Sequence, residues 1–65
     1  MNEPRINQKI HIIDSDETGT ITKVYPPCAE HSGRFIAYIH AKNRSYYTEF
    51  WYSDIDESVV LDKDE

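Results

Sequence analysis

Two short patterns in this chain contain residue types that bind metal ions. Asp14-x-Asp16-x-Thr18-Gly19 matches the first half of a calcium-binding EF-hand loop, in which alternate oxygens and a glycine bend surround a hard cation. The twelfth position of that loop needs a bidentate glutamate, and Tyr25 stands there instead. Cys28 and His31 offer two soft ligands, whereas a structural zinc site needs four. The sequence therefore predicts no metal site and no cofactor.

The same Cys28 and His31 are a possible nucleophile and base, but nucleophilic catalysis also needs a third group that orients the base. The many carboxylates show no spacing that pairs two of them for acid–base chemistry. A domain of 65 residues also has little interior left for a substrate pocket once its core is filled. We therefore expect a protein that is not an enzyme.

Charge is unevenly distributed along the chain. Twelve acidic and seven basic residues give a formal net charge of −5, which opposes general attraction to nucleic acid or anionic membranes. The acidic side chains gather in two turns, and three basic side chains gather around one hairpin. The first acidic turn contains Asp14, Asp16 and Glu17, the second contains Asp54, Asp56 and Glu57, and the basic group contains Arg34, Lys42 and Arg44.

The length of the chain and its cysteine content limit the classes of protein to which it can belong. We expect residues 1–65 to form a single domain, near the lower size limit for folding without disulfides or metal. The single cysteine, Cys28, cannot form an intramolecular disulfide, so a cytoplasmic protein is expected. Neither an export signal nor an apolar run of membrane-spanning length is visible, so no membrane contact is expected.

Short β-rich runs alternate with turn signals, and no segment keeps helical periodicity over three turns. The predicted strands are residues 9–14, 20–25, 34–41, 46–52 and 58–61, with a 3₁₀ turn at 53–57. Ile21 and Val24 are three positions apart, so they point to opposite faces of a regular strand. Burying both side chains on one face therefore requires a bulge. Gly19 and Asn43 are expected to take left-handed conformations in turns. The prediction is an all-β domain with an ordered core over 8–61 and flexible ends.

Five short strands with a 3₁₀ turn before the last resemble the SH3-like barrel over residues 8–61. The resemblance rests on Thr18-Gly19-Thr20-Ile21-Thr22-Lys23-Val24, similar to the glycine-led second strand of such barrels, and on Tyr52-Ser53-Asp54-Ile55-Asp56, similar to their closing turn. The layout is also similar to small SH3-like proteins of bacteria and their phages, the YorP type included. This resemblance implies a five-stranded SH3-like barrel and transfers a fold without a site.

The resemblance does not extend to the SH3 domains that bind proline-rich peptides. Those domains carry paired tryptophans and a Pro-x-Asn-Tyr segment, whereas here Trp51 stands alone and Asp54-Ile55-Asp56 replaces that segment. Recognition of proline-rich ligands is therefore not expected.

Strand alternation divides the apolar residues between two faces of the predicted sheet. The expected core contains Phe35, Ala37, Ile39, Phe50 and Ile55, with one or two of Ile10, Ile12, Ile21, Val59 and Leu61. Tyr38, Tyr47 and Trp51 then share the outer face, near the basic group. In the alternative, a curved barrel buries both faces in places, and these rings cover the second side of the core.

The leading functional hypothesis is a noncatalytic protein-interaction module, accessory or host-modulating in role, that binds another protein through the aromatic face or the acidic turns. The alternative is RNA or single-stranded DNA binding through Arg34, Lys42 and Arg44, with bases stacked on the aromatic rings. A third expectation is self-association through unpaired edge strands.

Overall fold

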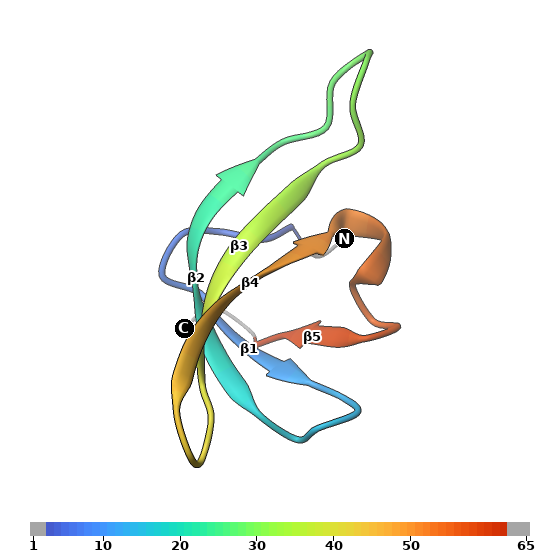
Figure 1. The fold of residues 1–65 in the computed structure, drawn as a ribbon. Coiled ribbons are helices and arrows are strands. Elements are labelled where there is room, and N and C mark those ends of the chain that lie inside the picture. Colours follow the sequence, from blue (N-terminus) through green and yellow to red (C-terminus); the bar gives the residue numbers. More distant parts are fainter. Residues whose placement is uncertain (1–2, 63–65) are drawn as a thin grey trace.

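A computed structural model describes residues 3–62, which form one antiparallel sheet of five strands. The elements are β1 (Lys9–Ile12), β2 (Thr18–Tyr25), β3 (Arg34–His40), β4 (Ser45–Trp51), a 3₁₀ turn η1 (Tyr52–Asp54) and β5 (Val59–Leu61). The strands follow the order β4-β3-β2-β1-β5 in a strongly curved sheet (Figure 1). The predicted all-β fold with a 3₁₀ turn before the last strand is confirmed, and the sheet is not closed between β4 and β5.

The predicted bulge in β2 is present. Ile21 pairs with Ala37 and Lys23 pairs with Ile36, so the register shifts by one residue between Ile21 and Lys23. The extra residue reverses the parity of the second half of β2. Ile21 is fully buried as a result, and Val24 also packs against the core.

The turn conformations predicted for Gly19 and Asn43 are wrong. The non-glycine residues with positive φ among those described are Asn7, Asp16 and Asp56, and no described glycine has positive φ. The short Asp and Asn side chains tolerate this conformation because they hydrogen-bond locally. Gly19 lies within β2, where an added Cβ would come within 2.7 Å of the Tyr38 carbonyl oxygen. Glycine is needed there for close packing of β2 on β3, and residues 41–44 turn without a left-handed residue.

The core lies on one side of the curved sheet and draws residues from β1, β2, β3 and β5. Its buried members are Ile10, Ile21, Phe35, Ala37, Ile39, Val59 and Leu61. The assignment of Phe35, Ala37 and Ile39 is confirmed, whereas Phe50 and Ile55 are only partly buried because they lie at the edge strand and in the turn that follows it. More of the isoleucine, valine and leucine candidates are buried than expected, because β5 pairs with β1 and both strands face the core.

The segment before β1 is bound to the sheet. Pro4 is buried, the Asn7 amide donates to the Ile21 carbonyl (2.7 Å), and the Ile21 amide donates to the Gln8 carbonyl (2.9 Å). The Gln8 side chain also donates to the Asp62 carbonyl. Of the ends expected to be flexible, residues 1–2 and 63–65 lie outside the described part of the chain.

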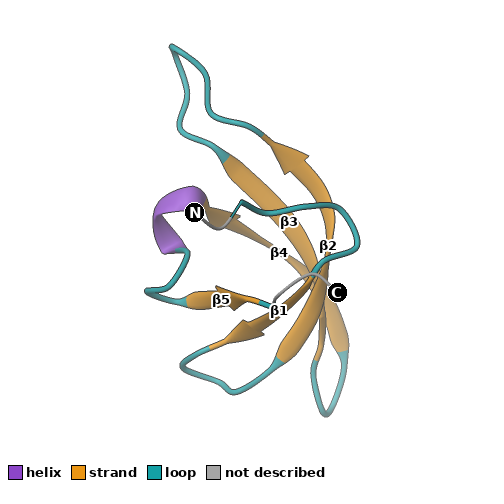
Figure 2. Cartoon of the chain, turned by 180° about the vertical axis from the view of Figure 1, so that it is seen from behind, coloured by secondary structure: helices purple, strands orange, loops and turns teal. Residues whose placement is uncertain are grey.

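Figure 2 shows the helical turn η1 between β4 and β5. Within residues 3–62, no helix has the length and apolar character needed to cross a membrane.

Candidate binding surface

The outer faces of β2, β3 and β4 form rows of side chains that cross the sheet. Directly opposed residues on antiparallel strands contact one another, so the register decides which outer residues meet. Four rows run from β2 through β3 to β4: Tyr25, Arg34 and Trp51; Lys23, Ile36 and Glu49; Thr20, Tyr38 and Tyr47; and Thr18, His40 and Ser45.

Tyr38 and Tyr47 form the aromatic centre of this face. Their ring centroids lie 4.8 Å apart with a 57° angle between the ring planes. His40 extends the cluster along β3, with its ring 5.3 Å from Tyr38 in an edge-to-face arrangement. Tyr47 leaves 67% of its surface exposed, whereas Tyr38 is half-buried by its neighbours. The pair therefore offers an exposed ring that is held in place by a second ring.

An open depression lies beside this tyrosine pair. It has a volume of about 400 Å³ and is lined by Thr22, Lys23, Ile36 and Tyr47. The Thr22 hydroxyl donates to the Ile36 carbonyl at 3.2 Å, so the bulged residue is anchored to β3. An isoleucine and a tyrosine next to a lysine suit an apolar side chain with an adjacent acidic or polar group. Lys23 and Ile36 were not among the predicted site residues. Parity alone does not locate the bulge that decides which way Lys23 faces.

Trp51 lies on the same face but at the far end of β4. It is opposite Arg34 and leaves 46% of its surface exposed. It lies four positions after Tyr47, a distance of about 13 Å along a strand. Trp51 is therefore a neighbour of the tyrosine pair and not a member of it.

The three basic residues predicted to cluster are not brought together. The Arg34 Nε atom lies 2.7 Å from a Glu49 carboxylate oxygen, and its guanidinium carbon lies 4.3 Å from the Tyr25 ring centroid. Lys42 and Arg44 lie in the β3–β4 turn, at the other end of a strand that spans about 20 Å. Arg34 is thus engaged within its own sheet, and only Lys42 and Arg44 share one location.

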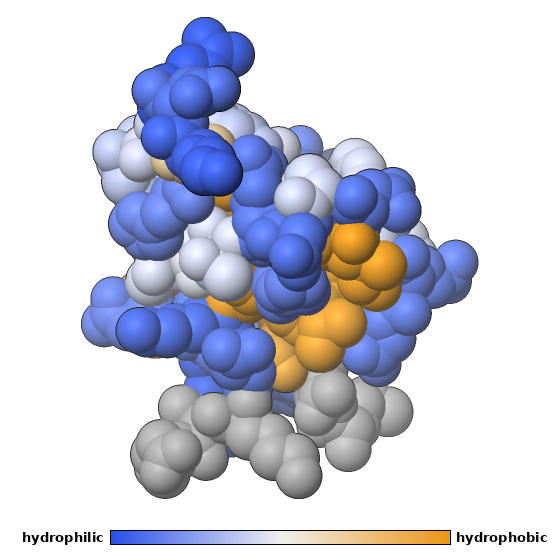
Figure 3. Space-filling model, turned by 90° about the horizontal axis from the view of Figure 1, so that it is seen from below, coloured by the Kyte–Doolittle hydropathy of each residue, from blue (hydrophilic) through white to orange (hydrophobic). Residues whose placement is uncertain are grey.

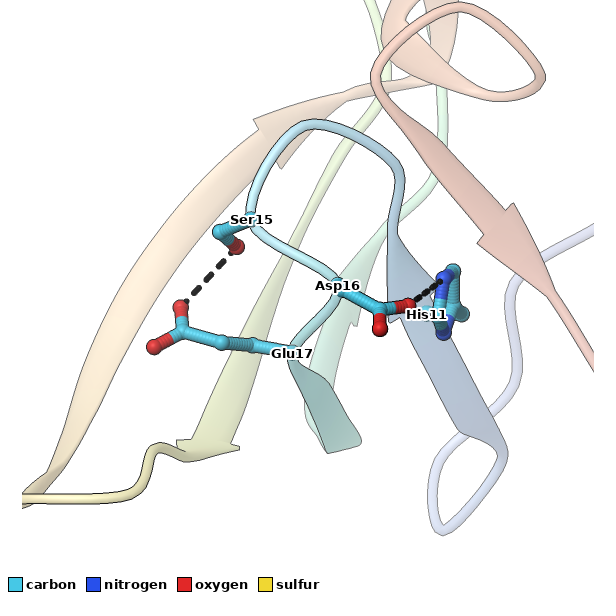
Figure 4. A network of polar contacts seen from close by, with 4 residues as sticks. All are labelled: His11, Ser15, Asp16 and Glu17. Carbon is cyan, nitrogen blue, oxygen red and sulfur yellow. Dashed lines mark hydrogen bonds and ion pairs between the residues drawn. The ribbon is translucent and has the colours of Figure 1, made fainter.

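In the first acidic turn, two of the three carboxylates bind groups of the chain itself. Asp16 Oδ1 lies 3.0 Å from His11 Nε2, and the Ser15 hydroxyl donates to Glu17 Oε1 at 3.0 Å (Figure 4). The same Glu17 oxygen accepts a bond from the Tyr46 hydroxyl at 3.0 Å. This hydrogen bond, assisted by burial and by the negative charge of Glu17, raises the pKa of Tyr46 above 10.0. Asp16 and Glu17 therefore hold the turn, and Asp14 is left exposed.

The second acidic turn also contains a carboxylate that binds the chain itself and others that are exposed. Asp54 Oδ2 accepts the Trp51 amide at 2.9 Å, and the Asp54 carbonyl accepts the amides of Glu57 and Ser58. Asp56 has positive φ, and its amide donates to the Val59 carbonyl at 2.7 Å. The Asp56 and Glu57 side chains are exposed, so they carry the charge that this turn presents to solvent.

A separate apolar area lies away from the tyrosine pair. Figure 3 shows apolar side chains exposed between polar ones when the molecule is seen from below. Ile13 is 44% exposed and Val60 37% exposed. Val60 lies opposite His11 on the outer face of β1 and β5, next to Ile13. Neither Ile13 nor Val60 is aromatic, in contrast to Tyr38 and Tyr47 on the face of β3 and β4.

Cys28 and His31 form a tight turn at the end of the long loop between β2 and β3 (Figure 1). Each amide donates to the other residue's carbonyl, at 3.0 and 3.3 Å, and both side chains are exposed. Within residues 3–62, no group of three or more histidine, cysteine, aspartate or glutamate side chains is placed to hold a metal ion.

The strand order and the 3₁₀ turn before β5 are compatible with an SH3-like fold. The surface formed by Lys23, Ile36, Tyr38 and Tyr47, here called the aromatic surface, combines the exposed ring pair with the neighbouring depression. Comparisons of the chain with protein-family models, with curated proteins and with solved structures found no match.

Proposed function

We propose that this protein is a noncatalytic protein-interaction module of the SH3-like class, and that it binds its partner through the aromatic surface. The observation that supports this proposal is the exposed Tyr47 ring, packed on the half-buried Tyr38 beside the depression of about 400 Å³. Tyrosine rings bury a large area on binding while few rotatable bonds are lost, and they are enriched among residues that dominate binding energy.

The chemistry of the surface indicates the kind of partner. The depression accepts one apolar side chain against Ile36 and Tyr47, and Lys23 at its rim attracts an acidic group next to that side chain. The exposed Asp14, Asp56 and Glu57 lie in the two acidic turns and supply a second contact for a partner that also carries basic residues. An accessory or host-modulating role is consistent with binding of this kind.

Binding of RNA or single-stranded DNA is the second proposal, because bases stack on exposed aromatic rings and Lys23 stands beside the tyrosine pair. The placement of the other basic residues favours it less. Arg34 is paired with Glu49, and Lys42 and Arg44 lie at the opposite end of β3 from Arg34. Binding that weakens steeply with salt, and that is lost in Lys23→Glu, would support this second proposal.

The test is capture of partners on immobilised protein, with and without nuclease, using wild type, Tyr47→Ala and Ile6→Ala. Ile6 is a matched control, because it is 60% exposed against 67% for Tyr47. We expect one protein to survive nuclease treatment, to bind wild type and Ile6→Ala equally, and to bind Tyr47→Ala at least about tenfold more weakly. Equal capture by all three proteins would show that the aromatic surface is not the binding site.

A further inference from the structure

The hydrogen-bonding pattern of β4 shows which of its backbone groups face away from the sheet. The Tyr52 amide donates to the Gly33 carbonyl at 2.9 Å, which makes residues 33 and 52 a hydrogen-bonded pair just beyond the β3–β4 register. Such pairs alternate along antiparallel strands. The residues that bond to β3 are therefore Tyr46, Thr48 and Phe50, and those whose amide and carbonyl groups point away are Ser45, Tyr47, Glu49 and Trp51.

An independent contact supports this assignment. The Trp51 amide, which should point away from β3, is bound by the Asp54 carboxylate at 2.9 Å. That contact closes the edge at its far end. Among residues 3–62, β4 pairs only with β3 and none of its residues is buried, so within this part of the chain the edge is open over Ser45, Tyr47 and Glu49. We call these three residues the β4 edge.

The other edge of the sheet is different. β5 has three residues, and its Val59 carbonyl already accepts the Asp56 amide at 2.7 Å. Ile55 also forms a bridge with Val59. The described residues therefore cover part of the β5 edge, whereas none of them covers the longer β4 edge in this way. An open edge strand is a template for pairing with another strand.

We propose that the β4 edge pairs with the β4 edge of a second copy of this chain, antiparallel and about a two-fold axis that passes by Tyr47. In this register Tyr47 faces Tyr47 of the second copy, and Ser45 faces Glu49 of the second copy on both sides of the axis. All three residues of the edge then form hydrogen-bonded pairs. Moving the axis to Glu49 would place two like charges opposite each other, and moving it to Thr48 would pair Ser45 with Trp51, whose amide is occupied.

The charges at the two ends of β4 favour a second copy as the occupant. Lys42 and Arg44 lie in the turn before β4, and the exposed Asp56 and Glu57 lie in the turn that follows η1. Antiparallel pairing places the basic end of each copy beside the acidic end of the other, so opposite charges meet at both ends of the interface. The two Tyr38–Tyr47 pairs also meet and form one aromatic row across both sheets.

This dimer is independent of the proposed function, because it uses the backbone of β4 and leaves the outer face of the sheet uncovered. The interface is small, so a dissociation constant on the order of 100 µM is expected. Sedimentation equilibrium over concentrations up to roughly 1 mM should show a monomer–dimer equilibrium for the whole chain. A single monomeric species over this range would overturn the proposal.

Charge variants at Ser45 test the register. In a dimer of Ser45→Glu, the new glutamate of each copy faces Glu49 of the other copy, and we expect dimerisation to be about tenfold weaker. Ser45→Lys should strengthen dimerisation by a similar factor. The control is Thr18→Glu, which adds the same charge on the exposed side of β2, an inner strand of the sheet, and should leave dimerisation unchanged. Equal effects of Ser45→Glu and Ser45→Lys would show that this register is wrong.

Disulfide trapping provides a second readout that does not depend on the strength of the dimer. In a Cys28→Ser background, Tyr47→Cys places two thiols in a hydrogen-bonded pair about 5.5 Å apart between Cα atoms, which a disulfide can span. Glu49→Cys places them about 13 Å apart in the same dimer. We expect Tyr47→Cys to cross-link and Glu49→Cys to remain reduced under the same mild oxidant. Equal cross-linking of the two would contradict the pairing, whatever the outcome of partner capture.

Discussion

Alternate residues of the same hairpin face different environments. Phe35, Ala37 and Ile39 on the inner side of β3 are fully buried, whereas Tyr38, which lies between Ala37 and Ile39 in the chain, packs on Tyr47 at the outer surface. The inner positions are constrained by volume, because a packed core tolerates little change in either direction. The outer positions are constrained only by their cross-strand neighbours. Stability should therefore depend on the inner face, and binding on the outer face.

We expect the largest difference in stability between the two faces when one aromatic ring on each face is truncated to alanine. Phe35→Ala removes a fully buried ring that contacts Phe50 and Tyr52 at centroid distances of 5.6 and 6.4 Å. It should lower the free energy of unfolding by about 3–5 kcal/mol, and Tyr47→Ala by about 0.5 kcal/mol or less. Urea denaturation measures both, and a comparable loss in the two variants would refute the division between the faces.

Gly19→Ala is expected to have the next largest effect, because it adds volume to the inner face. The new Cβ would lie 2.6 Å from Ile39 Cδ1 and 2.7 Å from the Tyr38 carbonyl oxygen, and the backbone atom cannot move without disturbing β3. We expect a loss of about 1–3 kcal/mol by thermal or urea unfolding. Thr18→Ala, one residue away and on the exposed side of the same strand, is the control and should change stability by less than about 0.5 kcal/mol. A stable Gly19→Ala would mean that β2 and β3 do not approach this closely.

Asp54→Ala tests the far end of β4, where the outer strand joins the closing turn. It removes the acceptor of the Trp51 amide, so a loss of about 1 kcal/mol is expected together with faster hydrogen exchange at that amide. Asp54→Asn keeps a side-chain oxygen and should retain most of the stability. Unchanged exchange at Trp51 in Asp54→Ala would show that the capping bond is absent in solution.

The smallest expected effect on the free energy of unfolding is a pH dependence that arises from Tyr46. The hydrogen bond to Glu17 raises the pKa of Tyr46 above its usual value of 10.0, so the folded state holds the Tyr46 proton more tightly than the unfolded chain does. This contribution is fully present below pH 10.0 and is lost as pH rises through the higher folded pKa. Stability measured above pH 10.0 should therefore decrease more steeply in wild type than in Tyr46→Phe. The same slope in both proteins would contradict the Tyr46–Glu17 bond.

Much of the fold could be predicted from local patterns. Side chains alternate along a strand with a period of two, so parity alone assigned Phe35, Ala37 and Ile39 to the core and placed Tyr38 on the opposite face. The difference in parity between Ile21 and Val24 predicted the bulge for the same reason. These inferences need only the order of residues within one strand, which is why they did not require the tertiary structure.

The contacts between strands were decided by the tertiary structure. The pairing of Arg34 with Glu49 and Tyr25 depends on the register of three strands, and the bond from Tyr46 to Glu17 joins residues 29 positions apart. A basic cluster predicted from nearness in sequence was therefore divided between the two ends of a strand. Strand order likewise leaves the β4 edge open and the Asp54 cap closes its far end, and the composition of β4 specifies neither. Periodicity acts locally along the chain, whereas register and closure depend on residues that only folding brings together.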